Sequence, residues 1–493
     1  MKMTRSEFDL EPPGIARWGN LAAEAIAADR EGLLQRPVFD RVGDMAPLFD
    51  EGLPEEGLPF EDVLAFVRKN VLPHPTGSHH PRYYGFVNSS ADPVGVVADY
   101  LAAAMNTNCW GGDHAANHVE KTALEWVAEL LGLPPETEGV LVSGGSTANW
   151  TALAAARRAL VPDVREEGLG RPGSPPPTIY ASDQVHSCVD KAVDLLGFGT
   201  RRLRKIPTGS DFRLRVDLLA EAVAADRQAG FRPAIVVANA GTVNTGAIDP
   251  LDELADFCRR EDLWFHVDGA YGALARLSPA QAPKFSGMER ADSLAADPHK
   301  WLFVPFGAGA AFVRRPGALS AAFRKFPEYL DTSPDAPLSG PVWFAERGIE
   351  LSRSFRALKI WMGLKVHGRR AYAEAIDRNV ELARVLSEAV DRAPDLERLS
   401  EPELSIANFR YRPAGSRMSE DELNDLNRRI IHRIVENGSA FVYPTVLHGR
   451  TSIRVCIVNF RTDEKDVSAL VGDVVRWGSE LAAGRSAAKA GAR

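Results

Sequence analysis

Short apolar runs separated by helical patterns constrain the fold of this chain more than any other feature. Each run is almost continuously apolar rather than alternating, which is typical of strands buried on both faces of a sheet. Because the runs alternate with helices, the sequence predicts an α/β domain over residues 81–370, with a mainly parallel sheet covered by helices on both faces. The runs are Gly139–Val142, Thr178–Ala181, Ala234–Ala238, Leu263–Val267, Ser293–Ala296 and Gly309–Val313.

The segments on either side of this domain have a different character. Residues 1–80 look helical, but prolines recur from Pro37 to Pro75 and argue against an independent core, so we expect an arm that packs on a partner subunit. Residues 371–481 predict a smaller α+β domain. The tail 482–493, rich in Ala, Gly, Ser, Lys and Arg, has the composition of a disordered segment. Within 371–481 we expect helices near 372–391 and 418–436, strands at 405–411, 441–444 and 452–458, and a last helix.

Four polar features fall at the ends of these elements. Lys300 stands between the strand at 293–296 and an apolar run, Asp268 closes the strand at 263–267, Ser143–Ser146 opens a helix, and His186 lies between. Ligands in such sheets bind at the carboxyl ends of strands. A lysine can form a Schiff base with pyridoxal phosphate, and an aspartate can partner its ring nitrogen. A Gly/Ser turn at a helix N-terminus can bind the phosphate. Together these features predict a pyridoxal phosphate site.

Each feature has an ordinary structural explanation when it stands alone. A lone lysine is usually a solvated charge, and an aspartate after a strand is usually a turn former. A Gly/Ser segment is commonly a helix N-cap, and a single histidine is more often structural than functional. The occurrence of all four in one order and at these spacings favours the cofactor site.

These residues lie in segments that resemble group II pyridoxal-phosphate-dependent amino acid decarboxylases, the family of the aromatic amino acid, histidine and glutamate decarboxylases. The resemblance implies a fold-type-I, transferase-like α/β architecture, with a mainly parallel sheet of the seven-stranded type and a smaller C-terminal α+β domain. It also implies pyridoxal 5′-phosphate as cofactor and a homodimer with composite active sites. The matching segments are Val142–Asn149, Tyr180–Ser187, Ala240–Asp249, His266–Tyr271, Asp297–Trp301 and Leu351–Lys359.

The resemblance assigns a role to individual residues. Lys300 would form the Schiff base, Asp268 would partner the ring nitrogen, and His186 would stack on the ring; these three would be the catalytic residues. Asp297 stands where the animal enzymes commonly have asparagine, and a carboxylate beside a phosphate is repulsive unless it is turned away or hydrogen-bonded. The full cofactor-binding set that the resemblance implies is Gly145, Ser146, His186, Thr242, Asp268, Ala270, Asp297, His299 and Lys300.

The implied reaction is decarboxylation of an L-amino acid to the corresponding amine and CO₂. The family supplies the proton for the α-carbon from a loop tyrosine, and counting back from Trp361 and Leu351 puts Phe344 in its place. A phenyl ring cannot donate a proton, and related plant enzymes with phenylalanine there resemble aldehyde synthases. Decarboxylation-dependent oxidative deamination to an aldehyde is therefore an alternative. Otherwise Tyr329, His186 or water supplies the proton, or the count misplaces the loop.

Two other classes of protein are weighed against the decarboxylase. A fold-type-I enzyme with different chemistry, such as another carbon–carbon lyase, is disfavoured by the segment Leu351–Lys359. A catalytically inactive scaffold that keeps only the fold is disfavoured because Lys300, Asp268 and His186 are all retained.

The substrate is the least determined part of this interpretation. By resemblance, the segment 105–110 reaches into the partner's pocket with Asn106 and Asn108, while Asn88 and Ser352 lie at substrate positions. Buried asparagines need hydrogen-bond partners, which favours a polar or smaller substrate side chain. Asn108 has the alternative of being a structural turn residue.

Composition excludes several other classes. The net charge of −8, without a long basic block, argues against nucleic acid and anionic membranes, and the run Arg201–Lys205 is interpreted as a solvated strand or edge. The cysteines lack metal-ligand spacing, and we expect reduced thiols in a cytoplasmic protein. No signal peptide or membrane span is predicted. His74, His79 and His80 lie in a Pro/Gly-rich loop without a second ligand cluster, so no metal site is expected. The cysteines are Cys109, Cys188, Cys258 and Cys456.

Overall fold

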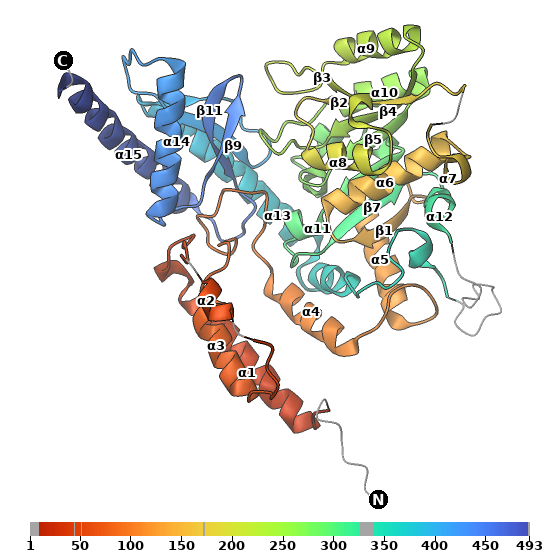
Figure 1. The fold of residues 1–493 in the computed structure, drawn as a ribbon, viewed down its shortest axis with the longest axis horizontal. Coiled ribbons are helices and arrows are strands. Elements are labelled where there is room, and N and C mark those ends of the chain that lie inside the picture. Colours follow the sequence, from red (N-terminus) through yellow and green to blue (C-terminus); the bar gives the residue numbers. More distant parts are fainter. Residues whose placement is uncertain (1–8, 44, 51, 171–172, 326–339, 492–493) are drawn as a thin grey trace, which may run out of the picture.

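The computed structural model describes residues 9–491, apart from 44, 51, 171–172 and 326–339. Figure 1 shows a large domain built on a seven-stranded sheet, a smaller domain built on a four-stranded sheet, and an N-terminal helical arm that extends away from both. The α-helices are α1 Pro12–Glu31, α2 Ala46–Phe49, α3 Phe60–Asn70, α4 Pro93–Met105, α5 Ala115–Leu130, α6 Gly145–Leu160, α7 Val164–Glu167, α8 Ser187–Leu195, α9 Val216–Gln228, α10 Leu251–Glu261, α11 Pro298–Trp301, α12 Ala318–Phe323, α13 Ala357–Arg392, α14 Glu420–Glu436 and α15 Glu464–Gly491. The strands are β1 Glu138–Val142, β2 Pro177–Ser182, β3 Leu203–Ile206, β4 Arg232–Asn239, β5 Trp264–Asp268, β6 Ser293–Ala296, β7 Gly309–Val313, β8 Leu396–Arg398, β9 Ile406–Tyr411, β10 Tyr443–Leu447 and β11 Arg450–Cys456.

The large sheet confirms the expected α/β architecture. Its strand order is β1-β7-β6-β5-β4-β2-β3, and every pair is parallel except those of β7, which runs antiparallel to both β1 and β6. All six apolar runs form strands of this sheet. The seventh strand, β3, lies at the edge and contains most of the basic run interpreted as a solvated strand or edge. Charged side chains on an edge strand discourage pairing with other chains.

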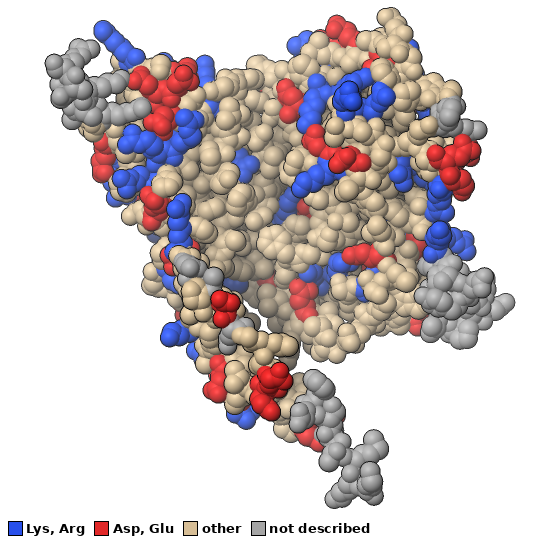
Figure 2. Space-filling model, in the orientation of Figure 1, with Lys and Arg blue, Asp and Glu red and all other residues tan. Residues whose placement is uncertain are grey.

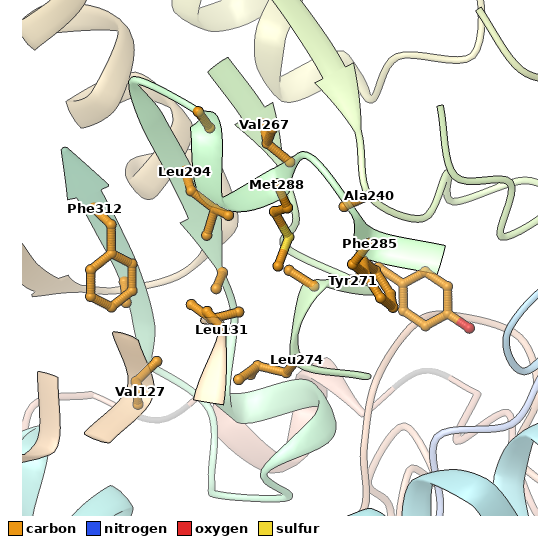
Figure 3. Close-up of a cluster of buried hydrophobic side chains, with 14 of the residues drawn as sticks. Val127, Leu131, Ala240, Val267, Tyr271, Leu274, Phe285, Met288, Leu294 and Phe312 are labelled. Atoms are coloured by element: carbon orange, nitrogen blue, oxygen red, sulfur yellow. The ribbon is translucent and has the colours of Figure 1, made fainter. Parts of the chain in front are cut away.

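Side chains that alternate along each strand divide the interior into two layers. In β5, Phe265 and Val267 enter a cluster covered by α5, α10 and α13. Figure 3 shows Val267 in this cluster with Leu294 of β6 and Phe312 of β7. The residues between them point to the opposite face, which α6 and α8 cover. Because the period of a strand is two, His266 and Asp268 share that opposite face.

The smaller domain has the antiparallel strand order β10-β11-β9-β8, packed against α13, α14 and α15. Helix α13 joins the two domains, and its backbone leaves helical conformation at Gly368, with φ 71° and ψ 162°, close to the expected boundary at residue 370. The segment 482–491 belongs to α15 rather than to a disordered tail. Alanine has the highest helix propensity, so an alanine-rich segment can extend a helix that is already formed.

The N-terminal arm buries little of its apolar surface within this chain. Trp18 of α1 stacks on Phe60 of α3 at a ring-centroid distance of 4.3 Å, yet Ala25 is the one buried side chain that α1 contributes and α3 contributes none. Across the face drawn in Figure 2, basic and acidic side chains are interspersed. Among the residues that the structure describes, no helix combines the length and apolar character needed to cross a membrane.

Candidate active site

A cavity of about 710 Å³ opens at the carboxyl ends of the parallel strands. Its walls come from β5, from the loop after β4, from the N-terminus of α6, from α11 and from β10 and β11 of the smaller domain. All nine residues predicted to bind the cofactor line this one cavity, and Asn88 lines it as well. Tertiary folding therefore brings together predicted residues that are up to 212 positions apart in the sequence, from Asn88 to Lys300.

Lys300 is presented by the short helix α11, which begins with Pro298 directly after β6. Proline suits the first turn of a helix because its fixed φ is already helical. The Lys300 Nζ lies 3.1 Å from Asp297 Oδ2, and the Asp297 side chain is 3% exposed. The second oxygen, Asp297 Oδ1, is buried and has no hydrogen-bond partner among the described residues. Asp297 is therefore a buried carboxylate with Lys300 as its charge partner, and one of its oxygens has no hydrogen-bond partner among the described residues.

Asp268 faces the cavity from the end of β5 and His186 from the segment after β2, with β4 between these two strands. Asp268 Oδ1 accepts a hydrogen bond from Ala270 N at 3.2 Å, while Cys188 Sγ lies 3.9 Å from Oδ2. His186 is the N-cap of α8, and its Nδ1 accepts from Cys188 N at 3.2 Å. Burial lowers the pKa of His186 from its ordinary value, so the imidazole is neutral and carries its proton on Nε2.

The N-terminus of α6 forms a cradle with no room for a side chain. A Cβ atom on Gly145 would lie 2.7 Å from Ala270 Cβ and 2.8 Å from Asp297 Oδ2, so only glycine fits. The N-cap, Gly144, has no side chain to cap the helix, which leaves the first-turn N–H groups for a ligand. His299 beside it is oriented by a bond between Nδ1 and Ala308 O at 2.8 Å. A helix N-terminus of this kind fits a phosphate, and with Lys300 and Asp268 the set fits pyridoxal 5′-phosphate.

Four predicted substrate residues do not lie in the cavity of their own chain. Asn106 ends α4 in the left-handed region at φ 45°, and Asn108 Oδ1 accepts from Arg353 N at 2.8 Å. Ser352 is exposed at the surface. Phe344 is fully buried, with the Arg353 guanidinium 5.2 Å from its ring, and it lines a separate small cavity next to β1. Tyr329 falls outside the described residues.

The sequence interpretation missed cavity residues that come from the smaller domain and from the segment before α4. They include Phe86, Tyr443 and Arg454. The rings of Phe86 and Tyr443 lie 5.1 Å apart, and Arg454 Nη1 donates to Val243 O at 2.9 Å. Only Arg454 had a sequence signal, because it is a lone arginine in an otherwise apolar strand pattern.

A known protein family and several relatives match this chain over most of its length. The profile described as the pyridoxal-dependent decarboxylase conserved domain matches residues 43–412. The chain belongs to the pyridoxal-dependent decarboxylase family. It is 37% identical over 478 residues to the aromatic-L-amino-acid decarboxylase of Bacillus atrophaeus, covering 96% of this chain and 97% of the relative. It is 29% identical to phenylacetaldehyde synthase of Arabidopsis thaliana, covering 92% and 93%.

Solved structures agree with this family assignment. The structure of Oryza sativa tryptophan decarboxylase with pyridoxal phosphate and tryptamine matches with a TM-score of 0.89 and 27% identity, covering 97% of this chain and all of that chain. This decarboxylase is therefore a pyridoxal-phosphate-dependent carboxy-lyase that acts on an amino acid. The expected family, fold type, cofactor and main reaction are confirmed.

Proposed function

We propose that this decarboxylase converts an aromatic L-amino acid to the corresponding amine and CO₂, in the cavity between β5, α6 and α11. The observation that carries the proposal is the meeting of Lys300, Asp268 and His186 in that one cavity. The activity in the name of the Bacillus atrophaeus relative supports the aromatic class of substrate.

The three central residues have distinct tasks in this proposal. Lys300 would hold the cofactor covalently through its amine. Asp268 would keep a proton on the ring nitrogen, and the neutral imidazole of His186 and the side chain of Ala270 would pack against the ring. Thr242 lines the cavity wall and would be a further cofactor contact. When bound, the cofactor supplies an electron sink for the pair left behind as CO₂ departs.

The phosphate is proposed to bind at the N-terminus of α6. The free first-turn N–H groups and the Ser146 hydroxyl are its donors, because Gly145 leaves that turn open. His299 would add a donor at Nε2 only in its charged form, because its Nδ1 proton is given to Ala308 O. Asp297 is proposed to balance the charge of Lys300 rather than to contact the phosphate, since the two already lie 3.1 Å apart. In this arrangement the Asp297 carboxylate is attracted by the positive charge of Lys300 and does not face the negative charge of the phosphate, which would repel it.

The residues at the cavity mouth favour a substrate with an aromatic side chain. Phe86 and Tyr443 form an aromatic pair there, and both rings keep exposed surface, at 40% and 48% for the two residues. Aromatic groups stack or pack edge to face on such surfaces with an added gain of about 1 kcal/mol beyond burial. The polar substrate favoured from Asn106 and Asn108 is the alternative; within their own chain Asn106 ends a helix and Asn108 Oδ1 accepts a hydrogen bond from the Arg353 backbone.

The product is expected to be the amine. Phe344 is packed in its own chain's core and cannot occupy the proton donor's place at the cavity without leaving that core. With a panel of twenty amino acids, we expect CO₂ and amine in a one-to-one ratio, no oxygen uptake, and the highest rate for an aromatic substrate. Tyr329→Phe should lower amine formation about a hundredfold or more if that tyrosine supplies the proton.

Two outcomes would contradict this expectation. Wild-type oxygen uptake equal to CO₂ release, with aldehyde and ammonia as products, would establish the aldehyde synthase reaction instead. A gain of amine in Phe344→Tyr would place residue 344 at the cavity after all. We expect Phe344→Tyr to leave the products unchanged and to lower stability, because it buries a hydroxyl without a partner.

The chain is proposed to act as a homodimer in which residues 1–80 pack on the partner and the active sites are composite. Helix α4 and the arm expose large apolar side chains that a single chain leaves in water, and such contiguous patches mark interfaces. The four from α4 are Val97 at 53%, Tyr100 at 56%, Leu101 at 45% and Met105 at 52% exposure.

Leu101→Glu should shift the protein from a dimer to a monomer of 53.7 kDa in sedimentation or light scattering and should lower activity in parallel. The matched control is Leu195→Glu on α8, where an isolated leucine is 75% exposed and the same change should leave the dimer intact. A wild-type monomer that is fully active at assay concentration would refute the composite site.

A cytoplasmic location is proposed on the basis of the cysteines. All four are free and buried rather than paired in disulfides, which suits a reducing compartment.

A further inference from the structure

A connected series of buried hydrogen bonds lies under the cavity, on the face of the sheet shared by His266 and Asp268. Asn149 of α6 and His266 of β5 are fully buried, and Ser293 of β6 is 2% exposed. His266 Nε2 lies 2.7 Å from Asn149 Oδ1, and His266 Nδ1 lies 2.8 Å from Ser293 Oγ. Trp264 Nε1 donates to the same Ser293 Oγ at 2.8 Å. None of these four residues lines the cavity.

The direction of each bond follows from the groups at its ends. Asn149 Nδ2 lies 2.9 Å from Gly145 O, and a carbonyl can only accept, so the amide nitrogen must face Gly145. Asn149 Oδ1 therefore faces His266 and accepts a proton from Nε2. At the other side, the indole of Trp264 can only donate, so the Ser293 hydroxyl accepts it and gives its own proton to His266 Nδ1. His266 is thus held as the Nε2–H tautomer.

All groups in this series are neutral. Burial lowers the pKa of His266 to about 4, so the imidazole is uncharged at pH 7. Burial raises the pKa of Cys188, whose thiol stays protonated. Asn149 Nδ2 also lies 3.5 Å from Cys188 Sγ, and Cys188 is the residue whose thiol faces Asp268. A buried network with satisfied groups is rigid, because any rearrangement leaves a polar group unpaired.

Asn149 is the member of the series that contacts residues at both ends of the cofactor site. Its amide holds Gly145 O in the proposed phosphate-binding turn and also contacts Cys188, which neighbours Asp268. We propose that Asn149 is a positioning residue for the cofactor, tying the first turn of α6 to the strand end that carries Asp268. This inference rests on the cofactor placement proposed above. A ligand bound at both ends gains affinity when the spacing of its two anchors is set in advance.

The test compares two buried asparagines with similar local roles. Asn427 in α14 is also fully buried, and its Nδ2 donates to the carbonyl four residues earlier, Leu423 O, at 2.9 Å, just as Asn149 Nδ2 does to Gly145 O. Asn149→Leu and Asn427→Leu are prepared without cofactor and titrated with pyridoxal 5′-phosphate, with tryptophan fluorescence and the visible absorption band as readouts. The melting temperature is measured on the same samples.

Both variants should melt at lower temperature, because each loses buried hydrogen bonds. Only Asn149→Leu should bind pyridoxal phosphate at least about tenfold more weakly, which corresponds to about 1.4 kcal/mol. Its kcat at saturating cofactor should fall more than its KM for the amino acid changes. Cofactor affinity in Asn149→Leu within twofold of wild type would overturn the proposal and leave Asn149 with a structural role alone.

A second variant keeps the proposal testable if Asn149→Leu does not fold. Ser293 lies beyond His266 in the series, away from the cavity. Ser293→Ala removes the donor that selects the His266 tautomer. It should weaken pyridoxal phosphate binding a few-fold, and wild-type affinity would count against the proposal. Failure of the cofactor placement itself is distinguishable, because the Lys300→Ala variant would then keep the visible absorption band of the bound cofactor.

Discussion

Lys300→Ala is expected to lower CO₂ release at least about a thousandfold and to abolish the visible absorption band of the bound cofactor. The amine is the only group in the cavity proposed to hold the cofactor covalently, and alanine has nothing to replace it. The fold should persist, since Lys300 is one partner of a single ion pair with Asp297. The measurements are a CO₂ assay, an absorption spectrum and a circular dichroism spectrum on one preparation.

The matched control is a buried lysine outside the cavity. Lys359 donates to Asp99 Oδ2 at 3.1 Å and to Phe306 O at 2.8 Å, and it does not line the cavity. Lys359→Ala should lower the melting temperature while the visible band and the rate per folded molecule remain. CO₂ release at the wild-type rate in Lys300→Ala would refute the assignment of the lysine.

Glu120→Gln is expected to have the largest effect on stability, at about 3–5 kcal/mol of the free energy of unfolding. Glu120 and Arg353 form an ion pair in which the side chains are 0% and 2% exposed. Arg353 also donates to Cys109 O at 2.7 Å and to Leu141 O at 2.8 Å. Removing the carboxylate charge leaves a buried guanidinium without compensation. The midpoint of chemical unfolding measures the loss.

The same helix offers a surface control. Lys121 and Glu125 form an exposed ion pair on α5, at 44% and 58% side-chain exposure. Glu125→Gln makes the same chemical change and should cost at most about 1 kcal/mol, because water screens exposed pairs. Equal losses in the two variants would mean that the Arg353 pair is no more important than a surface pair.

The elements of the large domain were predictable because each carries its own local signal. A strand buried on both faces must be continuously apolar, so β1, β2, β4, β5, β6 and β7 are visible in the sequence without any partner. Strand β8 was missed because it is three residues long and half-exposed, with no apolar run to mark it. The cofactor residues were predictable for a related reason. Asp268 ends β5 and Lys300 lies in the short helix after β6, and the carboxyl ends of these parallel strands meet at one edge of the sheet.

Phe344 shows what a count along the chain does not report. Its distance from Trp361 suggested the place of a proton donor, but position in the sequence does not report which way a loop residue faces. In the structure the ring is buried against Arg353 and lines a different cavity. Asn106 and Asn108 lie outside the cavity of their own chain, at a helix end and in a contact with the Arg353 backbone, so their expected place in the partner's pocket stays a prediction.

The amino-acid sequence by itself determined the α/β class, the cofactor and the residues at the strand ends, because periodicity and short motifs are local properties of the chain. Only the tertiary structure decided which distant residues share the cavity, such as Phe86 and Tyr443. It also decided the direction of the hydrogen bonds from Trp264 to Asn149, since donor and acceptor roles depend on neighbours brought together from three separate elements. Those relations are set by packing, which no local pattern encodes.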